Sequence, residues 1–161
     1  MRTALVLAAA GLLAAATMTV TATPAGAHGG HPQHFAAGAV RLDGAQEVPG
    51  PGDEDGRGMF AYLAFDSNLC YLLSARNIDP AAAAHVHSGA RGVAGPIVIG
   101  LTPPTDRLSA DCIEAVPDTT PNSPAVLTQS ELDAIIANPA GYYANVHNAP
   151  FPAGAIRGQL R

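Results

Sequence analysis

The sequence of 161 residues has no lysine and no tryptophan, and charged residues make up only 13% of it. Eight arginines stand against 13 acidic residues, and the formal net charge is −5. Nothing in this composition resembles a basic face for phosphates, so we predict no nucleic-acid partner. The low aromatic fraction, 5%, gives little support to a carbohydrate-stacking surface, and the four tyrosines are interpreted as half-buried strand residues.

The usual signatures of catalysis are also missing. We find no Ser/His/Asp order, no paired-carboxylate motif, no phosphate-cradling glycine loop and no cysteine-rich zinc module. The sequence therefore predicts no enzymatic activity.

The first 27 residues have the pattern of a secretory signal peptide. Arg2 precedes an apolar run from Ala4 to about Val20, and the segment closes on Ala25-Gly26-Ala27. A membrane anchor is the alternative, but the run is mostly alanine, which inserts weakly. No later stretch is long and apolar enough to span a bilayer. We expect residues 1–27 to be removed and the protein to be secreted.

Residues 28–34 follow as a flexible arm. His28, His31 and His34 stand there among glycine and proline. The arm is either a solvated tail or a weak metal-binding segment.

Two cysteines remain, Cys70 and Cys112. In an exported chain an even pair indicates a disulfide. This one would close a loop of about 40 residues, which contributes roughly 4 kcal/mol to stability by the chain-entropy argument. Two free buried thiols are the alternative.

The rest of the chain favours short strands. Alternating or apolar runs predict strands around Val40, over 59–65, 69–78, 83–87, 96–101 and 142–147, and at 155–160, whereas 101–124 is proline-rich and predicted to be irregular. Thr128 and Glu131 form a capping box for one short helix near 129–137, which ends at Asn138-Pro139. This pattern predicts an all-β fold. We expect an antiparallel β-sandwich or barrel, Greek-key-like, resembling superoxide-dismutase or immunoglobulin-type sandwiches.

Three motifs resemble the CHRD domain, which is named for repeats in chordin and also occurs alone in exported bacterial proteins. They are GAQEVP at 44–49, AHVHSGARGVAGPIVIGL at 84–101 and YYANVHNAPFPAGAIRGQL at 142–160. The resemblance implies that residues 35–161 form an extracytoplasmic all-β domain with no established enzymatic activity. The chain departs from the family at 88–91 and 144–148 without losing a histidine.

His85 and His87 are the first candidate site. Residues i and i+2 of a strand face the same side, with Cα atoms about 6.6 Å apart. With His147 from a second strand, three neutral imidazoles would suit copper or zinc. The His-X-His arrangement has an analogue on a strand of copper/zinc superoxide dismutases. In the alternative interpretation the histidines are structural and hydrogen-bond the backbone of the turns that follow them.

Glu47 and Arg157 are the second candidate pair. Arg157 lies among apolar neighbours in the last predicted strand, where a buried guanidinium needs a carboxylate. Glu47 is the best partner by position, so we predict a structural ion pair. The alternative is that Arg157 reaches solvent or backbone carbonyls.

Two functions follow from these patterns. One is a non-enzymatic exported domain that binds an extracellular protein or matrix component. The other is an extracytoplasmic copper- or zinc-binding protein that uses the strand histidines.

Overall fold

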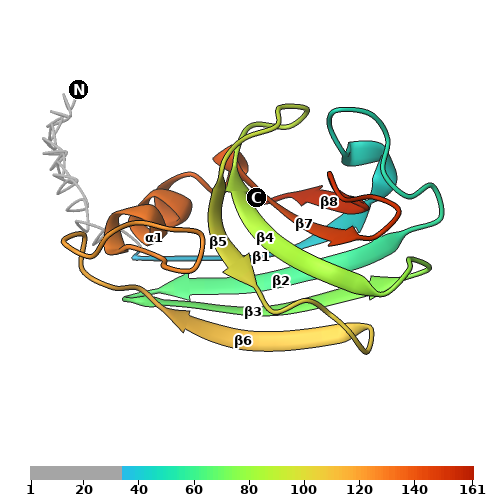
Figure 1. Ribbon diagram of the computed structural model, residues 1–161. Coiled ribbons are helices and arrows are strands. Elements are labelled where there is room, and N and C mark those ends of the chain that lie inside the picture. Colours follow the sequence, from blue (N-terminus) through green and yellow to red (C-terminus); the bar gives the residue numbers. More distant parts are fainter. Residues whose placement is uncertain (1–33) are drawn as a thin grey trace, which may run out of the picture. The chain divides into compact units, whose positions relative to one another are not determined.

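A computed structural model describes residues 34–161 and shows eight strands in one antiparallel sheet (Figure 1). The strands are β1 (Phe35–Asp43), β2 (Arg57–Phe65), β3 (Asn68–Arg76), β4 (Ala81–Ser88), β5 (Ile97–Leu101), β6 (Leu108–Glu114), β7 (Tyr142–Asn148) and β8 (Ile156–Gln159). The predicted signal peptide and residues 28–33 of the predicted arm lie outside the described residues.

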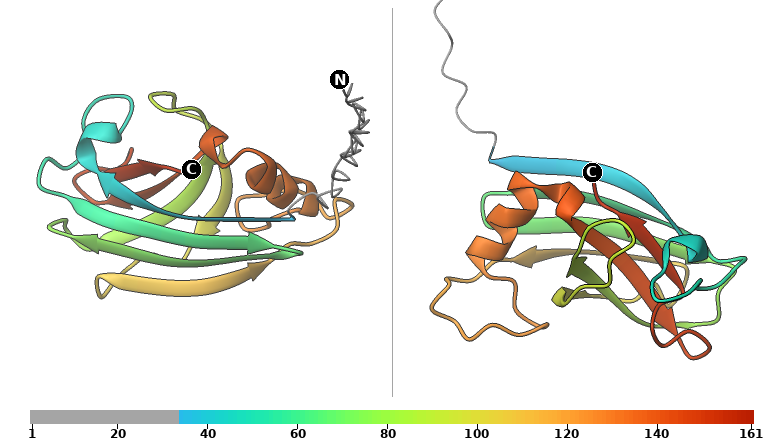
Figure 2. Two further views of the ribbon diagram at one scale, coloured as in Figure 1. Left: turned by 180° about the vertical axis from the view of Figure 1, so that it is seen from behind. Right: turned by 90° about the horizontal axis from the view of Figure 1, so that it is seen from above.

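The strand order is β5-β4-β7-β8-β1-β2-β3-β6, and every pairing is antiparallel. The sheet curls into a half-barrel whose edges are β5 and β6 (Figures 1 and 2). The all-β prediction with one short helix is confirmed. The last strand occupies the middle of the sheet, where it joins the β5-β4-β7 half to the β1-β2-β3-β6 half.

The hydrophobic core lies on the inner side of the curl. Alternate residues of β1 and β2, among them Val40, Leu42 and Phe60, are fully buried there. β4 and β7 contribute Val86 and Val146 in the same way. Within residues 34–161, no helix has the length and apolar character needed to cross a membrane.

The helix α1 (Gln129–Ala137) matches the predicted range and covers one end of the core (Figure 2). The Thr128 hydroxyl accepts a hydrogen bond from the Glu131 N–H, and the Glu131 carboxylate accepts one from the Thr128 N–H. This capping box satisfies two backbone donors at the helix start. Leu132 and Ile135 are the side chains that α1 buries.

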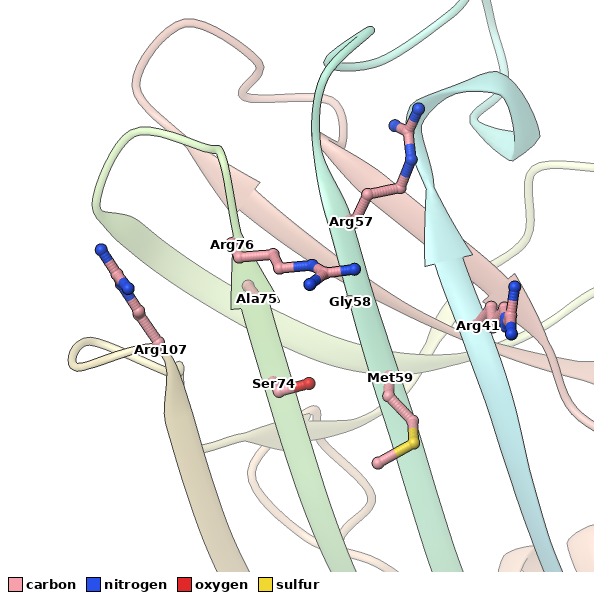
Figure 3. A pocket seen from close by; sticks show the side chains of 8 residues that line it. All are labelled: Arg41, Arg57, Gly58, Met59, Ser74, Ala75, Arg76 and Arg107. Carbon is pink, nitrogen blue, oxygen red and sulfur yellow. The ribbon is translucent and has the colours of Figure 1, made fainter.

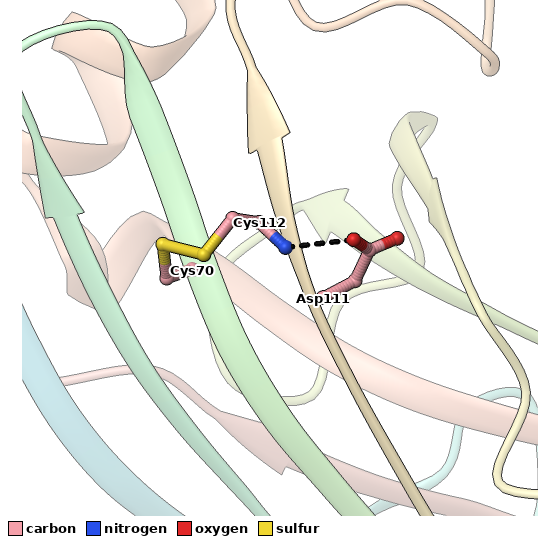
Figure 4. Close-up of a disulfide and its surroundings, with 3 residues drawn as sticks. All are labelled: Cys70, Asp111 and Cys112. Atoms are coloured by element: carbon pink, nitrogen blue, oxygen red, sulfur yellow. Dashed lines mark hydrogen bonds between the residues drawn. A yellow bond between two sulfur atoms is a disulfide. The ribbon is translucent and has the colours of Figure 1, made fainter.

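The prediction of an irregular segment over 101–124 is wrong in part, because β6 forms there. Every side chain of β6 is exposed or half-buried, so the segment lacks the alternation of a half-buried strand. Its pairing with β3 places Cys70 directly opposite Cys112, and the two form the predicted disulfide (Figure 4). The cystine therefore ties an edge strand with little buried surface to the sheet.

Candidate metal centre

The outer face of β4, β7 and β8 carries polar side chains, and most of them are shielded from solvent. The register aligns them in two cross-strand rows, His85–Asn145–Arg157 and His87–Tyr143–Gln159. Their chain neighbours, such as Val86 and Ala144, point to the core. Because residues i and i+2 share a face, His147 lies on the same side as Asn145.

The register brings the three predicted histidines together. His85 Nδ1 lies 3.0 Å from His147 Nε2, although 62 positions separate them in the sequence. One nitrogen each from His85, His87 and His147 lie within 4.8 Å of one another. In a tetrahedral zinc site, ligand nitrogens are about 3.4 Å apart at Zn–N bonds of 2.0–2.1 Å. Small ring rotations therefore bring all three onto one ion.

Backbone carbonyls fix the tautomers of two of these rings. His87 Nδ1 lies 2.9 Å from the Gly95 carbonyl oxygen, and His147 Nδ1 lies 3.1 Å from that of Pro152. A carbonyl oxygen only accepts, so each Nδ1 carries the proton, and in the neutral ring Nε2 carries a lone pair instead. His87 Nε2 is buried and has no hydrogen-bond partner among the described residues.

The environment keeps the cluster uncharged. Burial, followed by the neighbouring His147 and His87, lowers the pKa of His85 from 6.5 to about 4. Burial also lowers the pKa of His87 and of His147, against the opposing effect of their bonds to the turn carbonyls. All three rings are therefore neutral near pH 7, which is the form that binds a metal ion.

Tyr143 holds the ring of His87 and the turn above it. The two rings are stacked, with centroids 4.7 Å apart and planes at 7°. The Tyr143 hydroxyl accepts the Gly95 N–H, and the Gly95 carbonyl in turn accepts from His87. A Cβ at Gly95 would overlap the carbonyl oxygen of Ser88, so the turn needs glycine at this point.

Arg157 packs against the Tyr143 ring of this stack. Its Cζ lies 3.4 Å from the centre of the Tyr143 ring, and Nη2 donates to the Ala90 carbonyl oxygen and to Gln159 Oε1. Since β7 lies between β4 and β8, the ring of Tyr143 is held between His87 and Arg157. Arg157 is only 1% exposed.

Glu47 and Arg157 are both buried, as predicted, but no hydrogen bond joins them. Glu47 Oε1 and Arg157 Nη1 each lack a hydrogen-bond partner among the described residues. Burial raises the pKa of Glu47 from 4.5 to about 7, and the charge of Arg157 opposes that rise. The two groups thus interact through their charges, without a hydrogen bond. Arg157 instead donates to the backbone carbonyl of Ala90, as the alternative interpretation proposed.

Sequence reasoning identified the three histidines and missed the residues around them. Asn145 is 2% exposed, and its Oδ1 lies 3.1 Å from His147 Nε2. Tyr143, Asn145 and His147 alternate along β7, so the same two-residue period that placed His85 beside His87 marks them as one face. His34 is exposed and lies outside the three-histidine cluster.

Comparison with known proteins gives a family. The sequence model of the CHRD domain matches residues 39–160, which cover the sheet except the start of β1, the helix and all three histidines. No curated protein and no solved structure matches the chain. The three motifs and the match together show that this chain belongs to the CHRD domain family.

Proposed function

We propose that this protein is a non-enzymatic, extracytoplasmic metal-binding domain that holds Cu²⁺ or Zn²⁺ through His85, His87 and His147. The observation that carries the proposal is the convergence of three imidazole nitrogens within 4.8 Å, from one buried and two half-buried histidines. His87 Nε2 is buried without a hydrogen-bond partner among the described residues, and such an atom costs stability unless something fills the site.

The donor set selects the class of metal. Neutral imidazole nitrogens suit copper and zinc, whereas calcium and magnesium prefer oxygen ligands. The carbonyls of Gly95 and Pro152 act as the partners that commonly orient metal-ligating histidines and fix their tautomers. We expect Cu²⁺ to bind more tightly than Zn²⁺, following the general order of divalent-metal affinities.

The turn-shaping role of the histidines is compatible with this function. His87 and His147 bind the turns through Nδ1, which leaves Nε2 of each ring for the cluster, and His147 Nε2 lies 3.0 Å from His85 Nδ1. One ring can therefore shape a turn with one nitrogen and bind a metal with the other.

The proposed location outside the cytoplasm is supported by the disulfide between Cys70 and Cys112. Such bonds form and persist in oxidising compartments and are rare in the cytosol. The predicted signal peptide at 1–27 agrees with the same location.

The test is calorimetric titration of metal-free protein with Cu²⁺ and Zn²⁺, together with EPR of the copper complex. We expect one ion per chain, a dissociation constant below about 1 µM, equivalent to about 8 kcal/mol, and nitrogen hyperfine structure from several imidazoles. His85→Ala combined with His87→Ala should abolish this binding.

His34→Ala is the matched control, because it removes an exposed histidine from the same chain. It should bind as the parent protein does. Deletion of residues 28–34 controls for the whole arm. If the double variant kept full affinity while the deletion lost it, the strand cluster would not be the site.

A further inference from the structure

Arginines gather on the outer face of β1, β2 and β3, although the chain as a whole is acidic. A hollow of about 480 Å³ there is lined by Arg41, Arg57, Arg76 and Arg107, with Met59 and Ser74 between them (Figure 3). The four arginines are all exposed. They come from three adjacent strands and from the turn that leads into β6. Sixty-six positions of sequence separate the first from the last, so only the folded sheet brings them together.

The strand register places like charges opposite each other, which lowers the stability of the fold. Arg57 lies directly opposite Arg76 across the β2–β3 pair. Like charges directly opposite each other on one face of a sheet destabilise it. In Figure 3 the Arg76 side chain extends toward β2 near Gly58, whereas the Arg57 side chain points away from it. An anion bound at this end of the strand pair would offset the repulsion.

Among the described residues, no hydrogen bond joins the four arginines to a carboxylate. Arg57 donates to the carbonyl oxygens of Glu54 and Gly56, which carry no net charge. Asp43, which lies opposite Arg57 on β1, carries a negative charge beside it and accepts two hydrogen bonds from Gln46. The guanidinium groups therefore face solvent as cations.

The cationic surface continues past Arg41. A second hollow, of about 420 Å³, is lined by Arg41, Arg91 and Arg161 together with the acidic Asp43. Six of the seven arginines in residues 34–161 thus form one band across the sheet, and the seventh is the buried Arg157. We refer to Arg41, Arg57, Arg76, Arg91, Arg107 and Arg161 as the arginine band.

The dimensions of the band indicate an extended ligand. From β1 to β6 it crosses three strand spacings, or roughly 15 Å at 4.7–4.9 Å each. One sulfate or carboxylate ion contacts only one or two of these arginines. A linear polymer with anionic groups at regular intervals contacts them all, and each guanidinium fork matches a carboxylate or sulfate oxygen pair.

We infer that the arginine band binds a linear anionic polysaccharide that carries carboxylate or sulfate groups. Aromatic side chains are absent from the residues that line the two hollows, so bases of single-stranded nucleic acid find no stacking surface. A nucleic-acid duplex carries about one charge per 1.7 Å, a higher charge density than that of a glycan. The acidic remainder of the domain therefore repels a nucleic acid more strongly than a glycan. Met59 is the one apolar side chain in the first hollow that is large and exposed, which is too little to insert into a membrane.

The experiment measures binding of metal-free protein to polygalacturonate and to heparin at about 0.1 M salt, where screening acts beyond roughly 10 Å. We expect binding that weakens steeply as salt is added. Arg76→Gln with Arg107→Gln should weaken it about tenfold, since two charge-assisted contacts are lost. Neither residue contributes to the core, so the fold should persist by circular dichroism.

Thr119→Glu with Ala125→Glu is the charge-matched control. Both residues are exposed in the connection after β6. The length of β6, about 24 Å, lies between this connection and the hollow. This variant should keep the affinity of the parent.

Equal weakening by the two double variants would overturn the inference, because net charge alone would then explain binding. It would also be overturned if the parent protein bound neither polysaccharide, or if it bound oligothymidylate or phosphatidylglycerol vesicles more tightly at the same salt concentration. The metal site is not needed for any of these measurements, so a failure here leaves the metal proposal standing.

Discussion

The ring of Tyr143 lies parallel to the ring of His87, with centroids 4.7 Å apart, and its hydroxyl accepts the N–H of Gly95. Gly95 is also the residue whose carbonyl oxygen accepts the Nδ1 proton of His87. One tyrosine therefore positions both the imidazole and the backbone group that sets its tautomer.

This relationship predicts the effect of Tyr143→Phe. The variant keeps the stacked ring but releases Gly95, so His87 loses part of the restraint that directs Nε2 at the cluster. Removal of groups that orient metal ligands weakens metal affinity 10–100-fold. Because Tyr143 acts through Gly95, we expect about a tenfold loss in Cu²⁺ affinity by calorimetric titration.

Tyr71→Phe is the control for the general loss of a tyrosine hydrogen bond. Tyr71 is also buried, but on the core side of β3, and its hydroxyl accepts the N–H of Thr102, whereas the histidines lie on the outer face of β4 and β7. Both variants should lose about 1 kcal/mol of unfolding free energy, and only Tyr143→Phe should lose metal affinity. Equal metal affinity in the two variants would show that Tyr143 does not position the site.

The disulfide predicts a local rather than a global effect of reduction. β6 has no buried side chain, and Cys70–Cys112 is its covalent link to β3. In Cys70→Ser with Cys112→Ser we expect a loss of about 2–4 kcal/mol in unfolding free energy. Hydrogen exchange should accelerate first in the amides of β6.

Metal affinity should survive in the same double variant, because five strand positions separate β7 from β6 in the sheet. A parallel loss of metal binding and of β6 protection would instead show that the two ends of the half-barrel unfold as one unit.

The sequence predicted those elements whose signals are local. The capping box at Thr128 and Glu131 gave the bounds of α1 because both hydrogen bonds form within one turn. β6 was missed because its pairing with β3 and its cystine hold it in place, and neither contact leaves a hydrophobic period in the sequence. Its existence depends on partners about 40 residues away.

The site was predictable to the same degree. The two-residue period in β4 placed His85 and His87 on one side, and the family motif drew attention to His147. The stacking of Tyr143 and the gathering of the arginine band depend on strand order and register, which no single segment encodes. That is why a chain with scattered arginines and a net acidic charge gave no sign of a basic face.

Glu47 predicts a pH dependence of stability. Its pKa is about 7 in the folded protein and near 4.5 when exposed, so the folded state holds the proton more tightly. Stability from this group is therefore present at low pH and is lost as pH rises from about 4.5 through 7. Glu47→Gln mimics the protonated form and should lack this loss.

We expect Glu47→Gln and the parent to unfold alike near pH 4.5. Near pH 8 the variant should be more stable by about 1–3 kcal/mol. The upper end follows from about 1.36 kcal/mol for each pH unit between the two pKa values. Urea titration at the two pH values measures this difference. A variant that was less stable at pH 8 would mean that the ionised carboxylate stabilises the fold.

Arg157 is the natural partner in a double-mutant cycle with Glu47. Arg157→Leu removes the contact with the Tyr143 ring and the hydrogen bond to Ala90 at every pH. It also removes the positive charge that opposes the rise in the pKa of Glu47, and that part matters only when the carboxylate is ionised. The coupling energy between the two positions should therefore be about 1 kcal/mol near pH 8 and near zero at pH 4.5. A coupling of the same size at both pH values would assign it to packing. An Arg157→Leu variant that melted like the parent would show that the charge interaction does not stabilise the fold.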